Sequence, residues 1–449
     1  MKWWSDLWLK EGFAAFPQTL FTDKNYPEFK IWSDIVDEEM VRAMALDSLR
    51  STHPIEVPID NPNELEEIYD SITYAKSNSI IRMLFNHLGE ATFQKAIRDY
   101  LKKAPIRKCR DQRLLEEFVR RFWDSLMSSW TQQMGFPLVT VEETFLDGGR
   151  IELHLKQSRF LADGGHDEAN PVWQVPFGVT TAADPTHPKA KFLLMKAEDK
   201  FIVDGVKSNE WVKVNSNFSS FFRVQYSPKM LQSLLDGVKN RELGVLNRYQ
   251  LASDLYALVK SSRVSVSHFL ALLTVCQEEE DYFVWSAIDS GIGSIAHSLK
   301  HLDDERKLLD RFERFVCKMI EPVAAKLGWE PKEGETIHVG RLRALLLSRL
   351  SHFRHQPTIQ MALSKFNALV EKGVDVVPDL QKLIFRAVGF IKIQELFKKE
   401  LDEHSLKTLE RPLRQAVESI KVKESLLKNN VPDLDKYLQN VGYDQANLK

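Results

Sequence analysis

Hydrophobic positions recur at helical spacing through the first part of the chain. Apolar residues return every three to four positions along 4–16, 38–51 and 71–89, which predicts an amphipathic helix in each segment. Two more such segments follow over 90–103 and 113–134. We therefore expect residues 1–135 to be helical.

The period changes after Gly135, Phe136 and Pro137. Short segments rich in β-branched and aromatic residues follow, and Gly, Asp, Asn and Pro separate them, which is typical of strands joined by turns. The predicted strands cover 138–145, 150–160, 172–181, 191–196, 201–205, 210–216 and 220–227. About seven short strands predict a small β-sandwich over 136–226.

The helical period returns at Pro228 and continues to the end of the chain. Successive amphipathic segments with short polar turns predict helical hairpins stacked as a solenoid over 227–449. No strict repeat is visible, so the pattern does not define a repeat register. The expected fold class is α+β, predominantly α, with domains 1–135, 136–226 and 227–449.

Composition narrows the function classes. Lys plus Arg is 61 and Asp plus Glu is 63, and this balance argues against a nucleic-acid or membrane-surface partner. No apolar run reaches the ~18–20 residues of a membrane span, and charged residues interrupt the apolar N-terminal stretch. Cys109, Cys276 and Cys317 lie far apart, as expected of free thiols in a reducing compartment. We expect a cytoplasmic location.

The segment Trp8-Leu9-Lys10-Glu11-Gly12-Phe13-Ala14 carries candidate chemistry. By pattern alone it is a core helix with one acid. It also resembles the WLxEGFA element of the gluzincin zinc aminopeptidases, which remove single N-terminal residues from peptides. The resemblance implies that Glu11 is a metal ligand, the third protein ligand of a catalytic zinc whose fourth position holds water.

A second match begins at Ser71. The string Ser71-Ile72-Thr73-Tyr74-Ala75-Lys76 resembles the family's SYxKGA element, and Tyr74 lies 63 residues after Glu11, in agreement with the family's spacing. The resemblance implies that Tyr74 is catalytic and donates a hydrogen bond to the developing oxyanion. Read alone, it would be an amphipathic tyrosine with its hydroxyl at the surface. Ser77-Asn78 replaces the usual Gly-Ala, and we expect this change to crowd the substrate pocket.

The resemblance extends along most of the chain. It points to the puromycin-sensitive aminopeptidase branch and implies that 1–135 is the helical half of a thermolysin-like catalytic domain. It is weaker over 102–126 and after about Phe390, where the HEAT-like C-terminal domain is expected to be shortened. The segments that carry it include 46–59, 131–142, 171–177, 210–215, 221–227, 251–258 and 327–335.

Two elements of the family are missing from these residues: HExxH, which supplies two histidine ligands and the general base, and GxMEN, which binds the substrate amine. The nearest spacing is His297-Ser298-Leu299-Lys300-His301, which we interpret as a solvated helix face, with a metal site as the alternative. His352 and His355 have the same interpretation. One carboxylate does not hold zinc, so we expect this chain to bind no zinc although the family implies it.

Three hypotheses follow. The chain is a part of a zinc aminopeptidase that is inactive alone, a non-catalytic module that binds peptides or a protein, or an incomplete gene model of an active enzyme. The reading frame upstream of Met1 distinguishes the last from the others. We also expect the N-terminal helix to expose Trp3, Trp4, Trp8 and Phe13, a face that a protein partner could cover.

Overall fold

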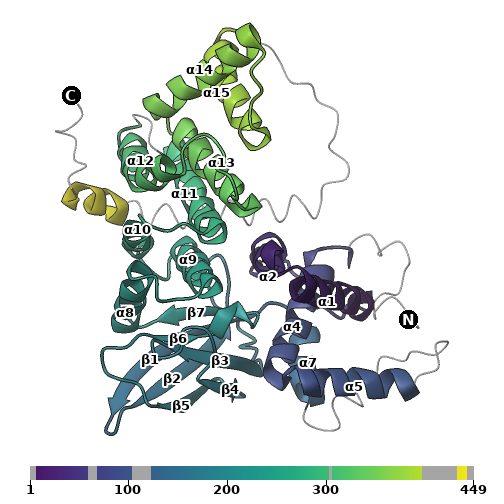
Figure 1. Ribbon diagram of the computed structural model, residues 1–449. Coiled ribbons are helices and arrows are strands. Elements are labelled where there is room, and N and C mark those ends of the chain that lie inside the picture. The colour runs from purple at the N-terminus through teal and green to yellow at the C-terminus, as the bar shows by residue number, and fades with distance from the viewer. Residues whose placement is uncertain (1–6, 59–67, 104–122, 303–305, 397–431, 442–449) are drawn as a thin grey trace. The chain divides into compact units, whose positions relative to one another are not determined.

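The computed structural model describes residues 7–58, 68–103, 123–302, 306–396 and 432–441 (Figure 1). The chain divides into two compact units, Met1–Arg263 and Val264–Lys449. Helices dominate both, and two small sheets lie in the first unit, so the predicted α+β, predominantly α class is confirmed. None of the helices in these described ranges is long and apolar enough to cross a bilayer.

The first part of unit 1 is helical, as its apolar period predicts. The long helix α1 packs on α4 and on the short turn that precedes α4. Gly12 allows the close approach, because a Cβ there would lie only 3.0 Å from Ser77 Cβ. The elements are α1 (Leu7–Asn25), η2 (Pro27–Phe29), α2 (Ile31–Ile35), η3 (Val36–Met40), α3 (Val41–Asp47), η5 (Ile72–Lys76), α4 (Ser77–Leu88), α5 (Glu90–Lys103) and α7 (Trp123–Thr131).

An aromatic core holds α1 in place. Phe16 lies 5.3 Å from Phe85 of α4 and 5.5 Å from Phe93 of α5, ring centre to ring centre, and Phe13 stacks on Phe93 at 6.5 Å. Trp8 is only 3% exposed. The expectation of an exposed apolar face is therefore wrong for Trp8 and Phe13, because neighbouring helices of the same unit cover that face. Trp3 and Trp4 lie outside the described residues.

The β-region contains two sheets. A four-stranded sheet has the order β5-β2-β1-β7, with β1 and β7 parallel, and a three-stranded sheet has the order β4-β3-β6. Phe201 of the first sheet packs on Phe177 and Phe192 of the second, with ring centres 5.3 and 5.0 Å apart, as in the core of a sandwich. Each predicted segment overlaps one strand: β1 (Pro137–Leu146), β2 (Arg150–Arg159), β3 (Val175–Thr181), β4 (Ala190–Leu194), β5 (Glu198–Asp204), β6 (Val212–Val214) and β7 (Arg223–Tyr226).

Two helices after the last strand belong to unit 1. They are α8 (Pro228–Lys239) and α9 (Val245–Lys260), and both pack on the strands. Arg223 of β7 forms a buried ion pair with Asp254 of α9 at 2.9 Å. The sequence pattern groups these helices with the later ones because period alone does not show which surface a helix covers.

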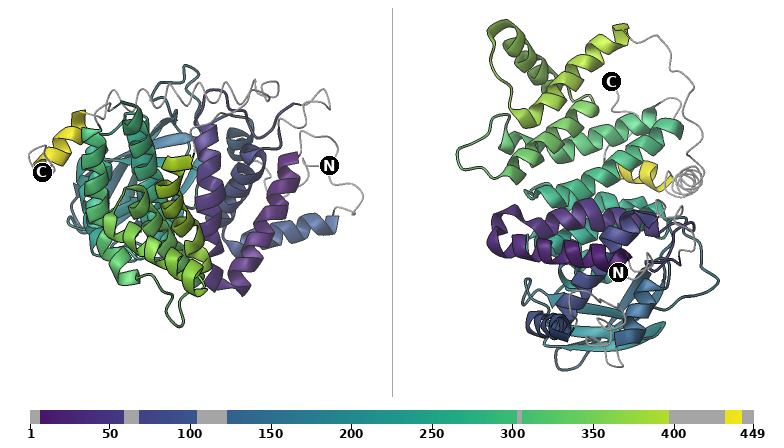
Figure 2. Two further views of the ribbon diagram at one scale, coloured as in Figure 1. Left: turned by 90° about the horizontal axis from the view of Figure 1, so that it is seen from above. Right: turned by 90° about the vertical axis from the view of Figure 1, so that its right-hand side faces the viewer.

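Unit 2 is entirely helical in the part that the structure describes. Consecutive helices from α11 to α15 pack side by side (Figures 1 and 2). A further helical segment over 432–440 packs on α12, where the rings of Tyr437 and Phe315 are 5.9 Å apart. The helices are α10 (Val266–Val275), α11 (Tyr282–Leu302), α12 (Lys307–Leu327), α13 (Ile337–His352), α14 (Gln356–Lys372) and α15 (Pro378–Leu396). Cys276 and Cys317 are buried free thiols, and Cys109 lies outside the described residues.

Candidate active site

The fold brings the two predicted site residues together. Glu11 lies on α1 and Tyr74 on η5, which packs against α1. Burial and the negative charge of Glu11 raise the pKa of the Tyr74 hydroxyl, with the neighbouring Tyr69 adding to the effect. A phenol is protonated at neutral pH even at its ordinary pKa of 10.0, so Tyr74 can donate a hydrogen bond there.

The Glu11 carboxylate has a cation beside it. Lys10 Nζ lies 2.9 Å from Glu11 Oε1, and the side chains are 60% and 15% exposed, respectively. Hydrogen bonding to Glu11 and its charge raise the pKa of Lys10. The Glu11 side chain is thus largely buried and pairs with an ammonium group from its own helix.

Asp70 fixes the start of the turn that carries Tyr74. Its Oδ1 accepts hydrogen bonds from the backbone N–H of Ile72 at 2.8 Å and of Thr73 at 3.2 Å. Its Oδ2 lies 2.8 Å from His53 Nε2. Burial opposes ionisation of Asp70, but these contacts hold its pKa below the ordinary value. A carboxylate at this position satisfies N–H groups that the first helical turn leaves without a partner.

Tyr74 and Lys76 point in different directions from η5, a π-helical turn of the kind often found at functional sites. Tyr74 is 37% exposed, whereas Lys76 is fully buried. Lys76 Nζ lies 2.9 Å from Asp47 Oδ2 and donates to the Gly135 carbonyl at 3.0 Å. The buried ion pair therefore anchors the turn and presents Tyr74 toward Glu11.

The residues that replace the family's Gly-Ala lie in the core. Ser77 is 0% exposed and Asn78 is 1% exposed, and Ser77 sits at the contact between α1 and α4. The structure thus places Ser77 beneath the Tyr74 turn, in a helix contact.

The donors around Glu11 do not fit a hydrolytic zinc ion. Such an ion takes three protein ligands, and no group of three His, Cys, Asp or Glu side chains within the described ranges has a suitable arrangement. Lys10 places an ammonium group where a cation would approach the carboxylate. No step through zinc is derived for these residues.

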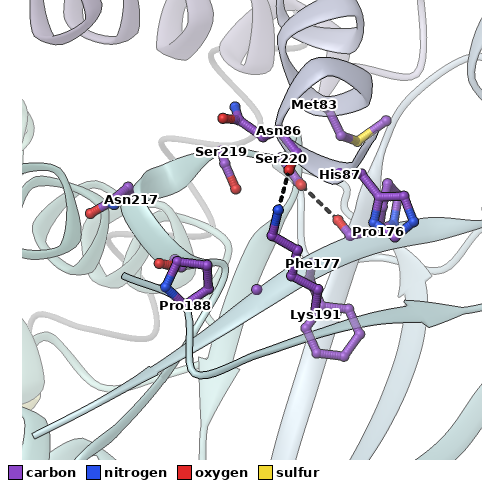
Figure 3. A pocket seen from close by; sticks show the side chains of 12 residues that line it. Met83, Asn86, His87, Pro176, Phe177, Pro188, Lys191, Asn217, Ser219 and Ser220 are labelled. Atoms are coloured by element: carbon purple, nitrogen blue, oxygen red, sulfur yellow. Dashed lines mark hydrogen bonds between the residues drawn. The ribbon is translucent and has the colours of Figure 1, made fainter. Parts of the chain in front are cut away.

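A separate cavity of about 150 Å³ lies in unit 1, lined by α4, β3 and η6 (Ser216–Phe218) (Figure 3). Neither Glu11 nor Tyr74 lines it. Lys191 Nζ donates to the Asn86 carbonyl at 2.7 Å, and Ser220 Oγ donates to the Pro176 carbonyl at 2.6 Å. These hydrogen bonds join neighbouring elements at the cavity wall. Because the lining includes neither Glu11 nor Tyr74, the cavity is distinct from the Glu11–Tyr74 site.

The sequence analysis did not predict that Asp70, Lys76 and Asp47 hold the turn that carries Tyr74. Asp70 had a readable signal, because an acid just before a helical segment is a typical N-cap. The pairing of Lys76 with Asp47 had none, since a contact across 29 positions leaves no local pattern.

Two known protein families match parts of the chain. Residues 1–130 match the peptidase family M1 domain, and residues 211–408 match the ERAP1-like C-terminal domain. The chain therefore belongs to the M1 peptidase family.

Among curated proteins, the chain is similar to the puromycin-sensitive aminopeptidase of Caenorhabditis elegans. The two are 42% identical over 420 residues, which cover 93% of this chain and 44% of the relative. Aminopeptidase M1-D of Oryza sativa subsp. japonica is 33% identical over 404 residues, covering 86% and 45%. Alanine/arginine aminopeptidase of Saccharomyces cerevisiae is 29% identical over 399 residues, covering 88% and 45%. The chain spans about half the length of the curated relatives that it matches.

Proposed function

We propose that these residues carry one half of the active site of a zinc aminopeptidase. In this proposal Glu11 is the carboxylate ligand, and Tyr74 donates a hydrogen bond to the oxyanion of the tetrahedral intermediate. The observation that carries the proposal is the juxtaposition of the two side chains: besides burial, the charge of Glu11 acts on the Tyr74 hydroxyl and raises its pKa, which places the two groups close together. Peptidases of family M1 are zinc-dependent in general, which supports the assignment of the carboxylate.

We further propose that a polypeptide of these 449 residues does not hydrolyse peptides by itself. Its sequence holds no HExxH, so it offers one carboxylate toward three zinc ligands and no base to activate water. General-base action contributes ~10²–10⁴-fold to a rate, and loss of the metal removes the activated nucleophile. The proposed state is a cytoplasmic polypeptide with a partial site.

The test is hydrolysis of a fluorogenic aminoacyl amide by the purified polypeptide, with and without added Zn²⁺. Glu11→Gln and Tyr74→Phe are assayed beside it. The expected result is no difference in rate among the three proteins. Zinc-dependent turnover that both substitutions reduce would overturn the proposal that the chain is inactive and would support the two residue roles.

A second candidate is a module that binds peptides without cleaving them. The favouring observation is that the Glu11 carboxylate holds an ammonium group, that of Lys10 at 2.9 Å, close to the exposed rings of Tyr69 and Tyr74, and a bound peptide amine would replace Lys10 there. A free peptide N-terminus offers the same ammonium chemistry. In this case a peptide should bind more tightly with a free than with an acetylated N-terminus, and Glu11→Gln should remove the difference. Equal binding of both peptides excludes this candidate.

A further inference from the structure

Helix α11 carries two histidines near its end. His297 and His301 are four residues apart, so they lie on the same face of the helix, and both side chains are exposed. Their ring centres are 4.8 Å apart, and the planes are inclined at 76°. The zinc helix of HExxH peptidases uses this same spacing of two imidazoles.

The separation of the rings suits a shared metal ion. With a metal–nitrogen bond of ~2.1 Å, each ring centre would lie ~3.2 Å from the ion. Two centres 4.8 Å apart then subtend about 97° at the ion, between the octahedral and tetrahedral angles. The helix fixes the two Cα positions, so rotation of the side chains is the change needed to direct one ring nitrogen of each histidine at the same ion.

The local charges also admit a cation. The pair lies in the last turns of a helix of 21 residues, where backbone carbonyls give a partial negative charge. Lys300 is the nearest cation in sequence, but its charge acts on Glu313 of α12 and on His352 of α13. Its charge is therefore shared with groups on the neighbouring helices.

We propose that His297 and His301 form a two-histidine chelate for a late first-row divalent ion such as Ni²⁺, Cu²⁺ or Zn²⁺. Imidazole nitrogen suits these ions, and water completes the coordination. Within the described ranges, no group of three His, Cys, Asp or Glu side chains includes the pair, so the proposal is limited to metal binding. It is independent of Glu11 and of the proposed peptidase function.

The test is isothermal titration calorimetry of the full chain with Ni²⁺ alone. We expect one ion per chain, and we expect either His297→Ala or His301→Ala to weaken binding about 10²-fold, because each turns a chelate into a single contact. His187→Ala removes an exposed histidine of unit 1 and serves as the matched control, and Glu11→Gln tests independence. Neither should change the affinity.

A second measurement guards against loss of folding. Circular dichroism should show the same helix content in all variants, because both rings are exposed. Cu²⁺ bound to the wild type should give an electron paramagnetic resonance signal with two nitrogen ligands, and each single variant should show one. Unchanged Ni²⁺ affinity in either histidine variant overturns the proposal, as does equal weakening in His187→Ala or Glu11→Gln.

Discussion

The Glu11–Tyr74 pair of unit 1 and the His297–His301 pair of unit 2 hold complementary parts of the donor set of a zinc peptidase. The first offers a carboxylate and a phenol, and the described part of the chain adds no group of three possible metal ligands around them. The second offers two imidazoles with ring centres 4.8 Å apart, and no third His, Cys, Asp or Glu among the described residues completes a ligand group with them. The difference shows that a motif's spacing creates a local geometry, whereas hydrolysis needs all the groups at one point.

The two pairs also rest on different supports. Tyr74 depends on contacts between distant segments, because its turn is anchored by the buried pair of Lys76 and Asp47. The histidines depend only on the regular geometry of one helix. Changes in the core should therefore disturb the first pair and spare the second.

The largest effect is expected from Lys76→Met. This change leaves the Asp47 carboxylate buried without its cation, which should lower the unfolding free energy of unit 1 by ~3–5 kcal/mol. Urea unfolding followed by tryptophan fluorescence measures the loss. Lys10→Met is the control, since that ammonium group is exposed, and it should leave the midpoint close to that of the wild type. Similar midpoints for all three proteins would show that the buried pair does not support the turn.

Features of the fold and the site that depend on residues close together in sequence were predictable, and features that depend on distant partners were not. The alternation of apolar residues located the strands, because each strand is read from its own side chains. The family motifs pointed to Glu11 and Tyr74, and the structure places them side by side. The burial of Trp8 and the pairing of Lys76 with Asp47 were not predictable, since both depend on partners distant in sequence.

The pH dependence of stability should also differ between unit 1 and unit 2. Burial lowers the pKa of Lys213 in unit 1 to about 7, although the charge of Asp254 opposes the shift. Unfolded lysine keeps its proton up to about pH 10.5, so the unfolded state binds more protons between those values. Unit 1 should gain up to ~1.4 kcal/mol of stability per pH unit above pH 7. Urea unfolding at pH 7, 8 and 9 measures this slope.

Lys213→Met should remove that slope, and the exposed Lys200→Met should keep it. Parallel pH profiles for wild type and Lys213→Met would contradict the assignment. The measurement reports on unit 1 only, because Lys213 Nζ donates a hydrogen bond to Gln250 of α9 in the same unit.

Unit 2 should respond to pH in the opposite sense. Burial raises the pKa of Glu313 on α12 to about 7, and Arg306 opposes the shift. The folded state therefore binds more protons than the unfolded state between pH 4.5 and 7, and stability falls as pH rises through this window. Glu313→Gln should flatten the profile of thermal unfolding between pH 5 and 7. A profile as steep as that of the wild type would exclude Glu313 as the cause.

The smallest effect concerns the Glu11–Tyr74 pair itself. Burial raises the pKa of Tyr74, and Glu11 adds to the rise. Glu11→Gln should lower that pKa part of the way toward 10 without changing the fold. Tyrosine ring resonances followed by NMR against pH report the change, and Tyr74→Phe assigns the signal. An unaltered Tyr74 titration in Glu11→Gln would mean that the two groups do not interact.

A measurement of zinc binding at Glu11 tests most directly the proposal that these residues hold only part of a zinc site. Equilibrium dialysis with Zn²⁺ should use a chain in which His297 and His301 are both replaced by alanine, so that the helix pair does not contribute. The account predicts no bound zinc above the level of the same chain carrying Glu11→Gln. One zinc ion per molecule that disappears with Glu11→Gln would contradict it.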